Sequence, residues 1–100
     1  MKDIVRKAIG TDLTPLQAKV FLILLDDKVV SVNGLLKKGF SEKTIRYLFR
    51  KWKSLDIITP MPAGLYRISN DVLKQVTPRI KEEIEKIAAN YSPSTTKKRF

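Results

Sequence analysis

Cysteine and histidine are both absent from this chain of 100 residues. The first absence excludes disulfides and thiolate chemistry, and the second removes the commonest general base and most zinc sites. The sequence also has no glycine-rich phosphate loop and no pair of carboxylates in a catalytic arrangement. We therefore expect a protein that is not an enzyme, that needs no cofactor and that holds no metal ion.

Long apolar segments are lacking too. The longest run, Val20–Leu25, is far below the ~20 residues that a helix needs to span a bilayer. No apolar stretch behind a basic start leads to a cleavage site of small residues, so the sequence does not indicate secretion. We expect a soluble protein of the cytoplasm, associated there with the nucleoid or with viral DNA. Neither a membrane partner nor a small-molecule effector is indicated.

Acidic residues are scarce, and the basic residues that outnumber them are concentrated. The chain has 20 Lys and Arg against 10 Asp and Glu, a net charge of +10 and a pI near 10.0. Such a charge favours a polyanionic partner, because neutralising phosphates releases their counterions. Between Leu35 and Leu55 only Glu42 is acidic. The same segment has seven basic residues: Lys37, Lys38, Lys43, Arg46, Arg50, Lys51 and Lys53. Double-stranded DNA is therefore the leading candidate partner, although basic surfaces also attract anionic membranes and composition alone does not decide between them.

A hydrophobic content of 43% in a chain of this length predicts one domain with a single core. Residues 1–13 are expected to form a short N-terminal helix, ended by Gly10, and a connector. A capping box that begins at Thr14 predicts a helix from Pro15 to about Leu25. This helix is apolar nearly all round, so it should lie at the centre of the core.

Two further helices are predicted to meet at the turn Gly39-Phe40-Ser41. Val29-Val30 suits a very short strand, and Ser31 can cap a helix that ends at Lys38. The serine of the turn can cap the next helix, which covers residues 41–55. Helical spacing places its apolar side chains on one face, namely Ile45, Leu48, Phe49, Trp52 and Leu55. The opposite face carries Lys43, Arg46, Tyr47, Arg50 and Ser54.

A hairpin is predicted to follow the helix over residues 41–55. Ile57–Thr59 and Leu65–Ile68 have the composition of two strands, joined by the proline-limited tip Pro60–Gly64. The expected fold class is therefore mainly α with a small β-hairpin, that is, α+β.

The last helix is predicted over residues 70–91, with Asn70 as its cap. Pro78 should cause a kink or a restart there, with Thr77 as the new cap. Its apolar positions form the C-terminal stripe: Leu73, Val76, Ile80, Ile84, Ile87 and Tyr91. We favour a dimerisation seam for this stripe, the alternative being that it folds back onto the core. Residues 92–100 are polar and basic and are expected to be a disordered tail.

The order helix, short strand, helix, turn, helix, hairpin resembles the winged helix-turn-helix family, specifically small prokaryotic, archaeal or viral transcription regulators. The resemblance covers residues 14–69. A small turn, a capping serine and a threonine–aliphatic pair at the start of the third helix carry it. These residues are Leu35, Leu36, Gly39, Phe40, Ser41, Thr44, Ile45, Leu48, Leu55, Ile57 and Ile58. The resemblance implies that the chain folds as a winged helix-turn-helix with an added C-terminal helix.

The resemblance also implies roles for the exposed face of the helix over residues 41–55 and for the basic residues beside it, which together form the basic face. In this family the recognition helix enters the major groove, so contacts there would come from Lys43, Arg46, Tyr47 and Arg50. Ser41 and Thr44 would donate to a phosphate. Attraction to the DNA backbone is assigned to Lys37, Lys38, Lys51 and Lys53. The wing departs from the family pattern, because Met61–Gly64 carries no positive charge and only Arg67 lies nearby. The basic end of the tail, Lys97–Arg99, is a hypothetical substitute.

Three functions are compatible with these patterns. We favour a sequence-specific transcription regulator that binds an inverted repeat as a homodimer, with its half-sites ~34 Å apart. The second is a replication, partition or architectural protein that coats DNA with little sequence preference. The third is a winged-helix protein-interaction module whose basic face meets an acidic protein.

Overall fold

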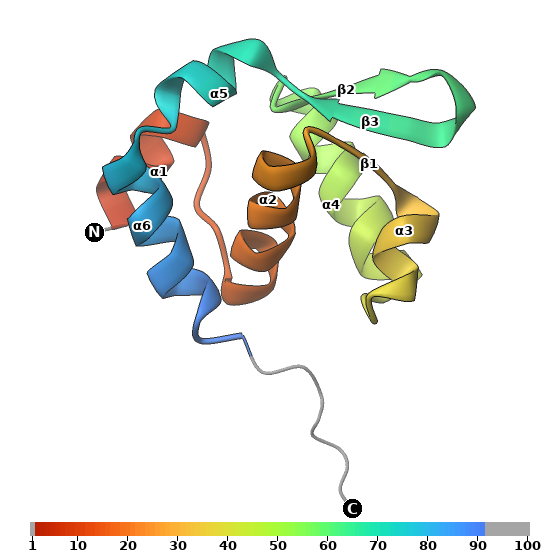
Figure 1. The fold of residues 1–100 in the computed structure, drawn as a ribbon, viewed down its shortest axis with the longest axis horizontal. Coiled ribbons are helices and arrows are strands. Elements are labelled where there is room, and N and C mark those ends of the chain that lie inside the picture. Colours follow the sequence, from red (N-terminus) through yellow and green to blue (C-terminus); the bar gives the residue numbers. More distant parts are fainter. Residues whose placement is uncertain (1, 92–100) are drawn as a thin grey trace, which may run out of the picture.

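Ten short elements follow one another along residues 2–91, the part of the chain that the computed structural model describes (Figure 1). In chain order they are α1 (Lys2–Ile9), α2 (Pro15–Asp27), β1 (Val29–Ser31), α3 (Val32–Lys37), α4 (Glu42–Ser54), β2 (Ile58–Met61), the 3₁₀ helix η1 (Pro62–Gly64), β3 (Leu65–Ile68), α5 (Asn70–Gln75) and α6 (Pro78–Ala88). The predicted α+β class, mainly helical with a small antiparallel sheet, is confirmed. The tail predicted at 92–100 lies outside the described residues.

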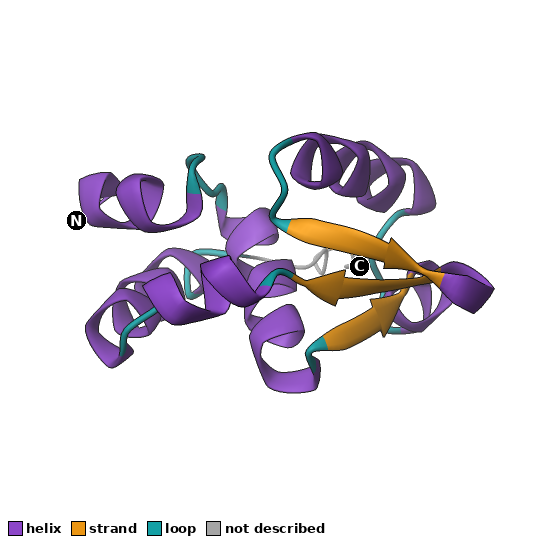
Figure 2. Cartoon of the chain, turned by 90° about the horizontal axis from the view of Figure 1, so that it is seen from above, coloured by secondary structure: helices purple, strands orange, loops and turns teal. Residues whose placement is uncertain are grey.

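The three strands form one antiparallel sheet, with β3 between β1 and β2 (Figure 2). The short strand predicted at Val29 joins this sheet, where Val30 is paired with Tyr66. The hairpin differs from the prediction, because β2 continues through Pro60 to Met61 and η1 alone forms the tip. Proline lacks an N–H donor, but β2 is an edge strand and needs hydrogen-bond donors on one side only.

Helix α2 lies at the centre of the helical body, between α6 and α4 (Figure 1). Its side chains Phe21 and Leu24 have no exposed surface. Trp52 of α4 is equally buried, and the ring of Phe21 meets it edge-on with centroids 5.8 Å apart. Leu55, predicted on the same apolar face as Trp52, is instead 43% exposed. The reason is that α4 ends at Ser54, so Leu55 occupies the C-cap, where the chain leaves the packed face.

Side-chain caps start the helices where the sequence predicts them, with one exception. The Thr14 hydroxyl accepts from the backbone N–H of Gln17, whose side chain accepts from the N–H of Thr14, so the capping box is complete. Thr77 caps α6 as predicted. Helix α5 is capped by Ser69 and not by the predicted Asn70, which is already the first helical residue. The two residue types cap about equally well, so their order in the sequence does not decide between them.

The C-terminal stripe is covered by the chain's own core. Pro78 restarts the helix, so α5 and α6 are separate, and α6 lies along α2 and α1. Ile84 is fully buried. The other five side chains of the stripe, which pack against the core, are Leu73, Val76, Ile80, Ile87 and Tyr91. The alternative in which the stripe folds back onto the core describes this arrangement, and the five side chains other than Ile84 are only partly buried by it.

Candidate nucleic-acid interface

A tight turn at Gly39 joins α3 to α4. The N–H of Phe40 donates to the carbonyl of Leu35 at 3.3 Å, and the N–H of Gly39 donates to that of Leu36 at 3.0 Å. This pair of bonds ends a helix at a left-handed residue, and Gly39 adopts that conformation with a φ of +102°. The Phe40 side chain is buried, and Ser41 caps α4. Backbone bonds and a core side chain therefore fix the orientation of α4 relative to α3.

Helix α4 separates its side chains into a buried and an exposed face, as its spacing predicts. The buried face consists of Ile45, Leu48, Phe49 and Trp52. The exposed face consists of the predicted Lys43, Arg46, Tyr47, Arg50 and Ser54, together with Glu42 and Lys53. Tyr47 is 61% exposed, so its ring is not part of the core. The four residues predicted to enter the major groove thus lie on the exposed side of one firmly packed helix.

Two hollows in the surface border the exposed face of α4. The first hollow, which we call the outer surface, is lined by Glu42, Lys43, Arg46, Tyr47 and Arg50. The second, called the α4–β3 cleft, has a volume of about 240 Å³ and is lined by Val32, Arg46, Phe49, Arg50, Lys53 and Tyr66. Arg46 and Arg50 contribute to both hollows, so they stand on the ridge between them.

One of the predicted contact residues has a partner within α4. Arg46 donates from Nε to Oε2 of Glu42 at 2.7 Å, across one turn of the helix. Both side chains are more than half exposed, so solvent and salt screen the pair. A spacing of four residues between opposite charges allows such a pair, although the charge count of the segment does not reveal it. The only carboxylate of the outer surface is therefore engaged by a ridge arginine.

The remaining predicted residues lie around this face. Ser41 is exposed at the start of α4, and Thr44 and Lys51 are half-buried along it. Three lysines are exposed at helix ends: Lys37 and Lys38 at the end of α3, and Lys53 at the end of α4. Arg67 is exposed on β3, where its Nη2 donates to Oδ1 of Asn70 at 3.5 Å. Arg67 does not line either hollow, so the structure does not join it to the basic face.

Tyr66 is the residue of this region that the sequence reasoning missed. It is paired with Val30 on one side and with Pro60 on the other, in the middle of the sheet. Its ring meets that of Phe49 on α4, with centroids 4.9 Å apart. Alternation along β3 predicts that Tyr66 and the buried Ile68 share a face of the sheet. Which helix covers that face depends on tertiary packing, so no local signal places Tyr66 beside α4.

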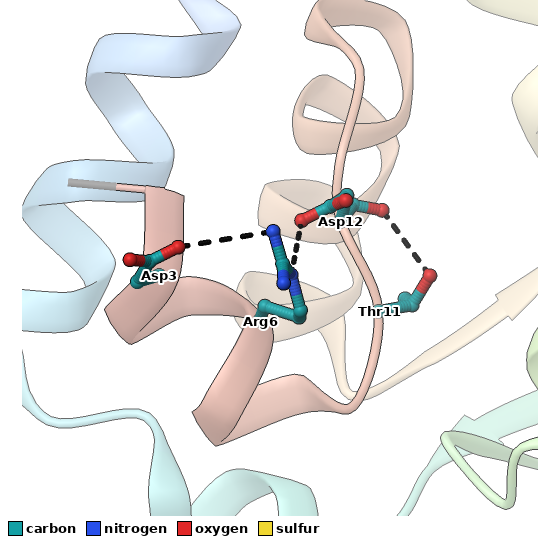
Figure 3. Close-up of polar contacts among 4 residues, drawn as sticks. All are labelled: Asp3, Arg6, Thr11 and Asp12. Atoms are coloured by element: carbon teal, nitrogen blue, oxygen red, sulfur yellow. Dashed lines mark hydrogen bonds and ion pairs between the residues drawn. The ribbon is translucent and has the colours of Figure 1, made fainter.

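A second group of charged residues lies at α1, on the other side of the helical body (Figures 1 and 3). Arg6 donates from Nε to Oδ1 of Asp12 at 2.9 Å, and its Nη2 lies 3.7 Å from Asp3. The hydroxyl of Thr11 donates to the carbonyl of Asp12 at 3.4 Å. The hydrogen bond with Asp12 raises the pKa of Arg6 above its ordinary value. The group holds one guanidinium between two carboxylates, so it ties α1 to the connector and its surplus of negative charge does not favour an anion.

Several other kinds of site lack support in the part of the chain that the structure describes. Residues 2–91 contain no cluster of three or more Asp or Glu side chains that could hold a metal ion. Within the same range, none of the helices combines the length and apolar character required to cross a membrane. Comparisons of the chain with models of protein families, with curated proteins and with solved structures find no match. The residues of the basic face themselves therefore carry the functional proposal.

Proposed function

We propose that this chain is a double-stranded DNA-binding protein, and not an enzyme, that places α4 in the major groove. One observation carries the proposal: the contact residues are exposed on one side of α4, while the opposite side is locked into the core. The major groove, ~12 Å wide, admits an α-helix. Arginine can fork onto guanine, tyrosine offers a hydroxyl, and the lysines at both ends of the face can neutralise phosphates.

The order of elements supports a winged helix-turn-helix as the framework. In this scheme α2, α3 and α4 are the three helices, α4 is the recognition helix, and β2 and β3 form the wing. The pairing of β1 with β3 attaches the wing to the helical body. Helices α5 and α6 are then the added C-terminal part. The tip of the wing, η1, contains no charged residue, so the proposal assigns it no contact with the minor groove.

Among DNA-binding functions we favour a transcription regulator of the cytoplasm that acts as a homodimer on an inverted repeat. Two recognition helices would then be separated by ~34 Å, one turn of the duplex. The C-terminal stripe packs against the chain's own core, which leaves only part of its surface for contact with a second copy. That same observation favours, as a second candidate, a protein that coats DNA without paired half-sites.

The decisive experiment combines selection with salt dependence. The full chain selects bound duplexes from a random pool, and its affinity for the selected and a scrambled duplex is then measured by fluorescence anisotropy. Six to ten phosphate contacts would lower the affinity by ~10³ to ~10⁵ between ~50 and ~200 mM salt. Arg50→Ala on α4 should weaken binding, whereas Arg79→Ala, which removes an exposed arginine on α6, should not.

The outcomes separate the candidates. Enrichment of a palindromic sequence supports the dimeric regulator. Tight, salt-dependent binding without enrichment of any sequence supports the coating protein. If the chain binds no duplex with such a salt dependence, DNA binding is refuted. An acidic protein then becomes the partner to seek for the basic face.

A further inference from the structure

The α4–β3 cleft collects three cations on a single stripe of α4. Arg46, Arg50 and Lys53 follow one another at spacings of four and three residues, which places them on one side of the helix. All three side chains are exposed, and all three line the cleft. Like charges at this spacing repel one another, so the arrangement costs free energy in the isolated chain. An anion seated between them would remove that cost.

The other residues that line the cleft are compatible with a bound anion. Val32 and Phe49 are the apolar residues of the lining, and apolar surface beside a charge strengthens a charge-assisted bond. Tyr66 brings a phenolic hydroxyl, and its ring is held by the contact with Phe49. None of the residues that line the cleft is acidic. Arg46 has a carboxylate partner in Glu42, which engages Nε, one of the five donors of that guanidinium.

We propose that the α4–β3 cleft holds one phosphodiester group of the DNA backbone. Arg46, Arg50 and Lys53 supply the charge, and the Tyr66 hydroxyl donates a hydrogen bond. This inference rests on the proposed function and changes its division of labour. Arg46 and Arg50 then clamp the backbone, and contacts with base edges are left to Lys43 and Tyr47, which line only the outer surface.

The first test compares two lysines of the same helix, one from each hollow. Lys53→Gln should weaken binding to every duplex by a similar factor and lower the slope of log affinity against log salt by ~0.9. Lys43→Gln, the matched variant, should alter the order of preference among duplexes. Tyr66→Phe should weaken binding to all duplexes without changing the slope, because it removes a donor and no charge. Circular dichroism would check that each variant is folded.

A modified duplex identifies the phosphate itself. Replacing one phosphate at a time by an uncharged methylphosphonate should reveal a single position at which Lys53→Gln has no further effect. At that position the effect of Lys43→Gln should persist. If Lys53→Gln changes the sequence preference, or if no such position exists although the wild-type chain binds DNA, the cleft proposal is overturned while the proposed function stands.

A titration with inorganic phosphate separates failure of the cleft from failure of DNA binding. At constant ionic strength, phosphate should shift the Nε–H NMR signals of Arg46 and Arg50 in a saturable manner, with Arg79 as an unshifted control. Saturation here together with no binding to any duplex would mean that the cleft takes a free phosphate, which refutes both the backbone assignment and the proposed function. Equal shifts at all three arginines would refute the cleft as a specific site.

Discussion

Arg46 and Glu42 form an ion pair across one turn of α4, with 2.7 Å between Nε and Oε2. The pair lies on the face that we propose for DNA, and Glu42 is the one acidic residue among those that line the two hollows. Exposed pairs of this kind contribute little to stability, so an incoming phosphate can replace the carboxylate as the partner of Arg46. In the proposed complex, Glu42 would thus compete with DNA for a ridge arginine.

Removing this competitor should strengthen DNA binding. Glu42→Gln deletes a negative charge beside the bound phosphates and releases Arg46, so we expect affinity for duplex DNA to rise roughly threefold to tenfold at low salt. The gain should shrink as salt screens the charge. Fluorescence anisotropy at two salt concentrations measures it. Glu85→Gln removes an exposed carboxylate on α6, a helix that packs on α1 and α2, and should leave affinity unchanged. An equal gain from both variants would show only the effect of net charge.

Two helix ends predict stability changes of opposite sign. Helices α3 and α4 both end at a left-handed residue, Gly39 with φ +102° and Asp56 with φ +61°. Gly39→Ala should lower the free energy of unfolding by about 1–2 kcal/mol through backbone strain alone. The added Cβ would meet no atom of the described residues within 4 Å. Asp56→Gly should raise the free energy of unfolding by roughly 1 kcal/mol, because glycine adopts a positive φ without strain.

Urea unfolding followed by circular dichroism measures both changes. Asp56→Asn is the control for charge, because it keeps a side chain that tolerates positive φ and removes the carboxylate from the negative end of the α4 dipole. A gain from Asp56→Asn as large as that from Asp56→Gly would assign the effect to charge. A loss of stability on Asp56→Gly would contradict the strain argument.

Local chemistry made much of this fold predictable. The capping box at Thr14, the glycine turn at Gly39 and the two faces of α4 depend on residues within one or two turns of each other, so the sequence contains the whole signal. The exposed positions of Lys43 and Arg50 followed from the same periodicity. Predictions failed where two candidates were locally equivalent, as for Ser69 and Asn70, both of which are good caps.

Tertiary packing decided the rest. An apolar stripe indicates that a helix face will be covered but not by what, so the sequence could not choose between a second copy and α2 as the cover of Ile84. Likewise, the α4–β3 cleft exists because β3 brings Tyr66 against Phe49, and these residues are distant in sequence. The exposure of Leu55 depended on where α4 ends, a boundary that periodicity does not fix.

Ser41 allows the stability of α4 to be separated from its affinity for DNA. Its hydroxyl accepts from the backbone N–H of Thr44 at 3.3 Å, so Ser41→Ala should lower the free energy of unfolding by about 0.5–2 kcal/mol. Ser41→Asp keeps a cap and should retain stability. Its negative charge would nevertheless face the phosphates, so the aspartate variant should bind DNA more weakly than the wild-type chain. Urea unfolding and anisotropy give the two readouts. Equal DNA affinity for the aspartate variant and the wild type would place the start of α4 away from the backbone.

Trp52 is fully buried, but its indole N–H lacks a hydrogen-bond acceptor among the described residues. An unsatisfied buried donor costs about 1–3 kcal/mol, so Trp52→Phe should remove that cost and thereby offset most of the packing that the smaller ring loses. The phenylalanine ring can keep the stacked contact with Phe49 and the edge-on contact with Phe21.

For Trp52→Phe we expect a loss of stability of about 1 kcal/mol or less, against about 3–5 kcal/mol for Trp52→Ala. Trp52 is the only tryptophan, so urea unfolding has to be followed by circular dichroism. If the phenylalanine variant loses as much stability as the alanine variant, the indole N–H is not a liability, and shape alone fixes the residue at the centre of the core.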